Sequence, residues 1–268
     1  MATNNQGSKS AREAAAAARA KAKAEQKARD RKVALIGTVV VVAVVAVLGV
    51  IGYVSVKNQN AIPSGPLPKG VTADTYGVKI GSAWKSANAD SIPKLELWED
   101  FQCPACGQME QNSGATILGL ADQGKLRLEW RPTIFLDDNL SEKNAAAGNP
   151  KSSLTATIAL GCAVDAGKGE RYHSAVFKRQ PAQEGTGYSI QDLTGAAMEV
   201  GISGEALTTF SNCLTSNKYE SWAKNSYKKF NESGVTSTPT GVLNGKELDQ
   251  QVLFDPAALS QAISDAAK

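Results

Sequence analysis

The sequence is poor in the side chains that build most transition-metal sites. It contains one histidine, His173, and three methionines in 268 residues. This scarcity excludes a histidine-rich metal site, and it disfavours copper delivery, which usually needs histidine or methionine beside a cysteine pair. Cysteine is scarce as well, with four residues: Cys103, Cys106, Cys162 and Cys213. The even number is compatible with two disulfide pairs.

Charged residues are missing from residues 33–56, which are mostly aliphatic. At about 1.5 Å per residue, a helix of this length crosses a hydrocarbon core of roughly 30 Å. The run exceeds the roughly 7–15 apolar residues of a cleaved signal peptide, and no clear cleavage site follows it. No cysteine follows it at once, which excludes lipoprotein processing. We expect an uncleaved transmembrane anchor, with a core helix or a cleaved signal peptide as the alternatives.

Residues 1–32 carry nine Lys or Arg against three acidic residues, whereas the rest of the chain has a slight acidic excess. The positive-inside rule therefore places this basic tail in the cytoplasm and residues 57–268 outside the cell membrane, as a single-pass protein. A basic, alanine-rich tail also suits nucleic acid. Because a membrane span follows it, we expect contact with anionic lipid and no nucleic-acid partner. All four cysteines then lie where disulfides persist.

Three prolines and two glycines lie within residues 57–70. This composition predicts a semi-extended tether, and we assign residues 57–75 to a linker and residues 76–268 to the extracytoplasmic domain. Within that domain, a run of helical patterns predicts a helical insertion over about residues 141–233.

The domain is organised around the sequence Cys103-Pro104-Ala105-Cys106. Residues 94–101 predict a strand, a helix is expected from Cys103 or Pro104 to about residue 121, and residues 125–135 predict a second strand. A C-x-x-C at the strand-to-helix turn of such a β-α-β unit is typical of a thioredoxin-like redox motif. A short accessory strand is expected over residues 75–80.

The remaining elements follow from periodicity and from turn residues. Trp130, Phe210, Tyr219 and Trp222 are expected in the core or in helix packing. Asn244-Gly245 between apolar runs predicts a β-hairpin. Further helices are predicted over residues 152–166, 170–178, 190–200, 204–215, 219–232 and 256–267. The fold class is therefore α/β.

Cys103 is the candidate nucleophile of the pair. The N-terminus of a helix lowers a thiol pKa from roughly 8.5, because unpaired N–H groups and the helix dipole favour a thiolate. Cys106, one turn further on, is the candidate resolving thiol, which attacks a mixed disulfide and releases the substrate. The alternative is half of a structural zinc site, but two further ligands at suitable spacing are missing.

The sequence resembles the DsbA-like thiol–disulfide oxidoreductases of the thioredoxin-like superfamily, in their membrane-anchored actinobacterial form. The resemblance covers residues 94–268 and depends on residues 98–106 (WEDFQCPAC), residues 236–240 (TSTPT) and the helical block between them. It implies a thioredoxin-like fold with a helical insertion. It also implies disulfide exchange on exported proteins, carried by the cysteine pair without a bound cofactor.

The resemblance extends to four further residues. Thr238-Pro239 is expected to face the cysteines, with Pro239 cis, so that the preceding backbone pairs with an extended substrate; an ordinary trans turn proline is the alternative. Cys162 and Cys213 are expected to form a structural disulfide outside the cytoplasm, which the resemblance also supports. Two buried free thiols are the alternative.

The sequence also departs from the best-known family pattern. Ala105 follows Pro104 where a histidine is usual, so a donor near the thiolate is lost and a weaker oxidant is expected. Thioredoxins often bury an acid six residues before the first cysteine, and Leu97 occupies that position here. Glu99 and Asp100 are nearby substitutes, although each also suits strand-end solvation or the start of a helix.

The predicted function is a membrane-tethered enzyme that introduces disulfides into reduced or unfolded exported proteins through Cys103 and Cys106. A quinone-linked membrane protein, similar to vitamin K epoxide reductase or to DsbB, would reoxidise the pair. A reductase or isomerase is the alternative within the same fold, although isomerases usually carry a dimerisation domain and residues 57–93 are short for one. A copper-handling module is the alternative from another class.

Overall fold

The computed structural model describes residues 64–267, which belong to one compact unit, Ile62–Lys268. The predicted cytoplasmic tail (1–32), anchor (33–56) and first part of the linker lie outside the described residues. Within residues 64–267, no helix has both the length and the apolar character needed to cross a membrane.

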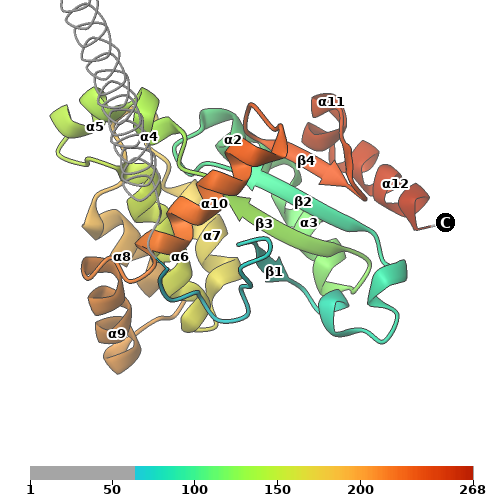
Figure 1. Ribbon diagram of the computed structural model, residues 1–268, viewed down its shortest axis with the longest axis horizontal. Coiled ribbons are helices and arrows are strands. Elements are labelled where there is room, and N and C mark those ends of the chain that lie inside the picture. The colour runs from blue at the N-terminus through green and yellow to red at the C-terminus, as the bar shows by residue number, and fades with distance from the viewer. Residues whose placement is uncertain (1–63, 268) are drawn as a thin grey trace, which may run out of the picture. The chain divides into compact units, whose positions relative to one another are not determined.

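The centre of the domain is a five-stranded mixed sheet with the strand order β1-β3-β2-β4-β5 (Figure 1). Strands β2 and β3 are parallel, and every other pair is antiparallel. The predicted β-α-β unit and the accessory strand are confirmed, with shorter strands than expected. The strands are β1 (Val78–Ile80), β2 (Lys94–Glu99), β3 (Arg127–Pro132), β4 (Thr240–Leu243) and β5 (Lys246–Glu247).

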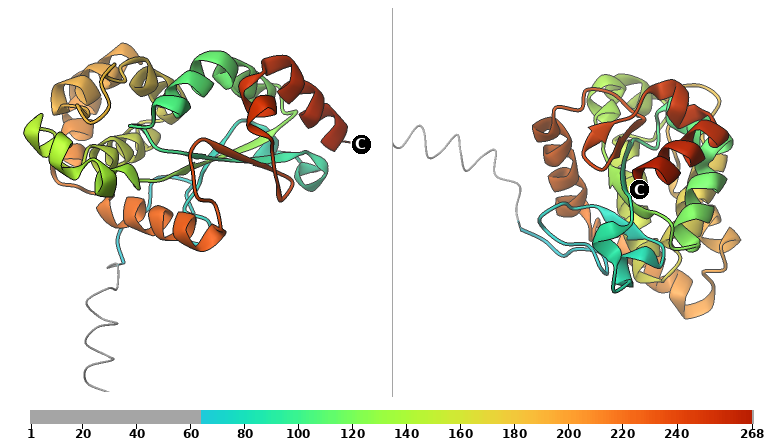
Figure 2. Two further views of the ribbon diagram at one scale, coloured as in Figure 1. Left: turned by 90° about the horizontal axis from the view of Figure 1, so that it is seen from above. Right: turned by 90° about the vertical axis from the view of Figure 1, so that its right-hand side faces the viewer.

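Helices cover both faces of the sheet. In the left view of Figure 2, α2, α3 and α12 lie on one face and α10 lies on the other, while α6 to α9 gather beyond one end of the sheet. The five helices predicted in the insertion are confirmed, and α4, α5 and α11 were not predicted. The α-helices are α2 (Pro104–Met109), α3 (Ala115–Asp122), α4 (Leu136–Asn139), α5 (Ser141–Ala146), α6 (Ser152–Asp165), α7 (Gly169–Lys178), α8 (Ile190–Glu199), α9 (Gly204–Thr215), α10 (Glu220–Ser233), α11 (Gln250–Phe254) and α12 (Pro256–Ala266).

The helix after the cysteines differs from the single α-helix that was expected. A π-helical turn, η3 (Glu110–Gly114), interrupts it between α2 and α3. Such turns add a residue to the helical repeat and often occur at functional sites. Two short 3₁₀ helices, η1 (Ala83–Lys85) and η2 (Ala89–Ser91), precede β2 and were also not predicted.

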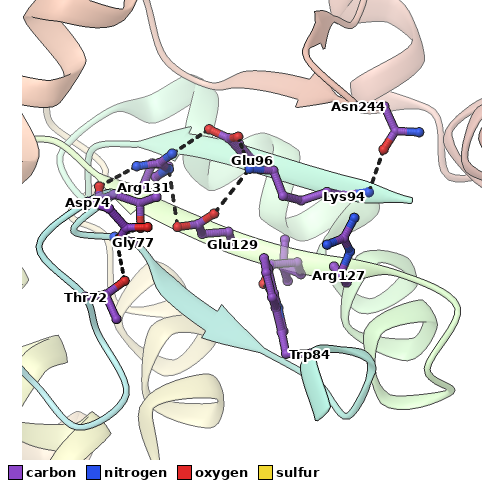
Figure 3. A network of polar contacts seen from close by, with 12 residues as sticks. Thr72, Asp74, Gly77, Trp84, Lys94, Glu96, Arg127, Glu129, Arg131 and Asn244 are labelled. Atoms are coloured by element: carbon purple, nitrogen blue, oxygen red, sulfur yellow. Dashed lines mark hydrogen bonds and ion pairs between the residues drawn. The ribbon is translucent and has the colours of Figure 1, made fainter. Parts of the chain in front are cut away.

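Strand β3 is buried on both faces, although its apolar residues alternate with charged ones. Glu129 and Arg131 retain only 1% and 7% of their accessible surface. The backbone before β1 covers them, because Arg131 donates to the carbonyl oxygen of Thr75 and binds Glu96 at 2.7 Å (Figure 3). The Lys94 Nζ atom lies 3.7 Å from Glu129 Oε2. These paired charges make burial of this face tolerable.

Residues 64–75, which were assigned to the linker, lie on the domain. The backbone N–H of Lys69 donates to Asp165 Oδ1 at 3.0 Å. The Trp222 indole donates to the carbonyl oxygen of Tyr76 at 2.8 Å. The compact unit therefore starts before residue 76.

The structure pairs Cys162 on α6 with Cys213 on α9 in a disulfide, with a Cα–Cα distance of 5.9 Å. This is the expected pairing. Together with the apolar core, it holds two helices of the insertion side by side. The aromatic core prediction is also confirmed, because Trp130, Phe210, Tyr219 and Trp222 are each at most 2% exposed.

The predicted hairpin is present as β4 and β5. Asn244 and Gly245 both have positive φ, 48° and 82°, as a two-residue turn of this kind requires. The peptide bond between Thr238 and Pro239, just before β4, is cis.

Candidate active site

The two cysteines lie at the first turn of α2, directly after β2. Cys103 is the N-cap residue, with extended backbone angles, and Pro104 takes the first helical position. Proline suits that position because its missing N–H would have no partner in the helix. The N–H of Cys103 donates to the Asp100 carbonyl oxygen at 2.9 Å, which closes the turn between strand and helix. Cys103 and Cys106 are both free thiols.

Cys103 is the more accessible thiol and the more acidic one. It keeps 7% of its surface exposed, whereas Cys106 keeps none. A hydrogen bond from the Cys106 side chain, with further bonds from Thr238 and the backbone N–H groups of Cys106 and Ala105, lowers the pKa of Cys103 to about 6. Cys106 shifts in the opposite direction. Its burial, and then the neighbouring Cys103, raise the pKa of Cys106 well above its ordinary value. One thiol is therefore primed as a thiolate and the other is kept protonated.

Pro104 and Ala105, the residues between the cysteines, are exposed. The Ala105 side chain supplies no donor, as expected, but its backbone N–H contributes to the lowered pKa of Cys103. The missing histidine is thus partly replaced by the helix terminus itself.

The segment Thr238-Pro239 lies against the nucleophile. The Cys103 thiol donates to the carbonyl oxygen of Thr238 at 3.3 Å, across 135 positions of sequence. The cis bond turns this backbone toward the cysteines, and Pro239 has no N–H to compete there. The structure therefore brings all four predicted residues of the redox site together.

A buried cluster of titratable groups lies behind the cysteines. Glu99 Oε2 is 3.1 Å from His173 Nε2, and His173 Nδ1 is 3.9 Å from Glu110 Oε2. Burial, and then the nearby Cys103, raise the pKa of Glu99 well above its ordinary value. Burial also raises the pKa of Glu110 to about 8 and lowers the pKa of His173 to about 4. Burial therefore favours a neutral histidine and the protonated form of both carboxyl groups.

Glu110 and His173 were not predicted. Glu110 follows Cys106 by four residues, so helical spacing alone would have placed it on the same helix face. His173 comes from α7 and stacks on Trp130 at a centroid distance of 3.7 Å, which no sequence signal indicates. Glu99, Glu110 and His173 are close enough to hold a metal ion. An ion would need both carboxylates charged, which their burial opposes.

Asp100 has a structural position. Its carboxylate accepts hydrogen bonds from Ser153 Oγ at 2.6 Å, Gln102 N at 2.9 Å and Leu136 N at 3.1 Å. Burial raises the pKa of Asp100 to about 7. Asp100 therefore joins the active-site turn to the start of the insertion. The three groups that donate to its carboxylate do not include either thiol. Leu97 is fully buried in β2.

Comparison with known proteins identifies the family. A family model described as thioredoxin matches residues 87–265. The chain belongs to the thioredoxin family. No curated protein sequence matches this thioredoxin-family chain significantly.

Several solved structures resemble this family member. MdbA, a thiol–disulfide oxidoreductase from Actinomyces oris, is 23% identical with a TM-score of 0.61, covering 75% of this chain and 93% of its own. Oxidised DsbA from Mycobacterium tuberculosis is 27% identical with a TM-score of 0.57, covering 71% and 92%. Reduced DsbG from the same organism is 25% identical with a TM-score of 0.56, covering 71% and 86%.

The MdbA match supports the fold alone at its level of identity. With the family assignment, the DsbA match and the Cys103–Cys106 pair, the protein is a DsbA-like thiol–disulfide oxidoreductase of the thioredoxin superfamily.

Proposed function

We propose that the protein works as an oxidase, which transfers the Cys103–Cys106 disulfide to reduced exported proteins. The observation that carries this direction is the lowered pKa of Cys103, about 6. A stabilised thiolate favours the reduced enzyme, which makes its disulfide a better oxidant. The similarity to DsbA from Mycobacterium tuberculosis, at 27% identity, supports the same class of activity.

The transfer proceeds by two thiol–disulfide exchanges. A substrate thiolate attacks Cys103 Sγ, a bond forms between the two sulfurs, and the Cys103–Cys106 bond breaks with Cys106 leaving as a thiolate. A second substrate thiolate then attacks the substrate sulfur of this mixed disulfide, and Cys103 leaves as a thiolate. Two electrons pass from substrate to enzyme, so a separate oxidant must restore the pair. The carbonyl oxygen of Thr238, beside Cys103, is positioned to pair with the backbone of an extended substrate.

Glu99 supplies a proton in this scheme. The Cys106 thiolate that forms in the first exchange is buried, so it needs a proton quickly. Burial raises the pKa of Glu99 and so favours its protonated form, and a charged Glu99 would interact unfavourably with a thiolate on either cysteine. A hydrogen bond between Glu99 and Glu110 links this proton to the rest of the buried cluster, Glu110 and His173.

We further propose that residues 33–56 anchor the enzyme in the cell membrane, with residues 1–32 in the cytoplasm and the catalytic domain outside. The uncharged run and the basic tail before it support this arrangement. A quinone-linked membrane protein, similar to vitamin K epoxide reductase or to DsbB, would accept the two electrons. Tethering would keep the enzyme close to such a partner.

The direction is tested by two measurements on the same preparation. The reduction potential of the Cys103–Cys106 pair is determined against glutathione, and the oxidised protein is added to a reduced, unfolded substrate whose activity returns only with its disulfides. A potential well above roughly −270 mV, the thioredoxin value, and faster recovery are expected. Cys103→Ser should abolish the recovery. A thioredoxin-like potential without faster recovery would support a reductase.

A further inference from the structure

A glutamine of the helical insertion, Gln180, donates hydrogen bonds to the backbone of the active-site turn. Gln180 follows α7 by two residues, and its backbone N–H donates to the Phe177 carbonyl oxygen at 3.0 Å. Its side-chain Nε2 donates to the carbonyl oxygens of Phe101 and Cys103, at 2.8 and 2.9 Å. An amide nitrogen has two hydrogens, so both are used on the backbone that flanks the reactive thiol.

The Cys103 carbonyl oxygen also begins α2, because it accepts the N–H of Gly107 at 3.2 Å. Gln180 therefore holds the peptide unit that follows Cys103 and the one that follows Phe101, which restrains the backbone from which the Cys103 side chain projects. It thereby restrains the position of the sulfur relative to the N–H groups of Ala105 and Cys106. Its hydrogens also offset the carbonyl dipoles of Phe101 and Cys103. Tyr188 assists from the insertion, with its hydroxyl donating to the Phe101 carbonyl oxygen at 2.9 Å.

Gly107 leaves the space in which the Gln180 amide lies. It is buried directly after Cys106, and a Cβ at this position would lie 2.2 Å from Gln180 Oε1. Gly107 lies within α2 without a positive φ, where glycine is less favourable than alanine. The missing side chain leaves the space that the Gln180 amide occupies.

We infer that Gln180 is a positioning residue for Cys103, whose amide holds the backbone on both sides of the thiol in the space that Gly107 leaves open. This assigns the helical insertion a part in the chemistry: it supplies a donor pair at the active-site turn, where Ala105 supplies no side-chain donor. The inference rests on Cys103 being the reacting thiol, as proposed above. The titratable groups that act on Cys103 are Cys106 on α2 and Glu99 on β2, and the variants below leave both in place.

The test uses the reduced full-length protein and the pH dependence of Cys103 alkylation by iodoacetamide, with the labelled residue identified by peptide mass. Gln180→Met keeps the length of the side chain and removes both donors. It should move the midpoint of the profile upward by roughly half a pH unit, which is about a threefold loss of thiolate below the midpoint. Gln183→Met, an exposed change in the same loop, is the matched control and should leave the midpoint unchanged.

Gly107→Ala provides the second variant, because its methyl group displaces the Gln180 amide without altering either cysteine. It should give the same upward shift, and the double variant should shift no further than either single one. Unchanged midpoints in folded variants would overturn the inference, as would shifts that add in the double variant. A lower melting temperature with an unchanged midpoint would indicate a structural role only. Labelling of the wild type at a residue other than Cys103 would instead contradict the proposed nucleophile.

Discussion

At the scale of single residues, the two cysteines differ through what surrounds each sulfur. Cys103 is hydrogen-bonded to the side chains of Cys106 and Thr238 and to the helix N-terminus, whereas Cys106 is enclosed beside Glu99. Identical side chains three positions apart therefore take opposite roles. The surrounding donors, more than the residues between the cysteines, set this difference.

The acidity of Cys103 predicts a thiolate at neutral pH. In the reduced protein, the absorbance of the thiolate at 240 nm should rise with a midpoint near pH 6. Cys106→Ala removes the bond that lowers this pKa most, so the midpoint should move upward, toward the roughly 8.5 of a free thiol. A midpoint that stays near 6 in the variant would show that the helix terminus and Thr238 act alone.

The same shift links stability to pH. Because the pKa of Cys103 is lower in the folded protein than in the unfolded chain, its contribution to the stability of the reduced form is complete above roughly pH 8.5. That contribution is lost as the pH falls through about 6. Thermal melts of reduced and oxidised protein between pH 5 and 9 should show that the melting temperature of the reduced form falls, relative to that of the oxidised form, as the pH decreases. A constant difference would contradict a thiolate of this acidity.

Glu99→Gln should slow the formation of the mixed disulfide, by about tenfold or more, because glutamine cannot protonate the Cys106 thiolate. Stopped-flow fluorescence with a thiol peptide measures this rate. Glu96→Gln, on the same strand but paired with Arg131 on the other face, is the control and should leave the rate near that of the wild type. Equal rates for the two variants would remove Glu99 from the mechanism.

At the scale of elements, the insertion is tied together by the α6–α9 disulfide and tied to the active-site turn by Asp100, Gln180 and Tyr188. The disulfide and the redox pair are separate structures with separate tasks. Cys162 and Cys213 join α6 to α9 as a disulfide, whereas Cys103 and Cys106 are the free thiols of the active-site turn.

Replacing both Cys162 and Cys213 by alanine should cost about 4 kcal/mol of unfolding free energy in the chain-entropy model, because the loop they close spans 51 positions. Chemical denaturation of the oxidised protein measures the loss. Alkylation of Cys103 in the folded variant should proceed as in the wild type. A large change in Cys103 reactivity with little change in stability would mean that the two pairs have been assigned the wrong way round.

The sequence predicts the elements far better than it predicts the environment of the thiols. Strand β2, the helix start at Pro104 and the hairpin at Asn244-Gly245 depend on local patterns, so they could be predicted. Helical spacing from Cys106 could have indicated Glu110, but His173 reaches the cluster through the packing of α7, which no local pattern encodes. The burial of Arg131 could not be predicted either, because the segment that covers it is distant in sequence.

At the scale of the whole molecule, the proposed anchor predicts how the protein partitions in the cell. The full-length protein should remain in the membrane fraction after extraction at alkaline pH. Such extraction releases proteins that are bound peripherally, whereas a protein with a spanning helix stays in the bilayer. A variant without residues 33–56, exported by a cleavable signal, should be recovered in the soluble fraction. Release of the full-length protein by alkaline extraction would contradict an uncleaved anchor.

The docking of residues 64–77 has a mechanical consequence. A force applied to the chain before residue 64 would first load the contacts of this segment with α6, α10 and β3, through Asp165, Trp222 and Arg131. None of these contacts involves α2 or the Thr238–Pro239 segment. A pull on the N-terminal side would therefore not act directly on the contact between Cys103 and Thr238. It would reach the active-site turn only through the sheet and through the contact of α6 with Asp100.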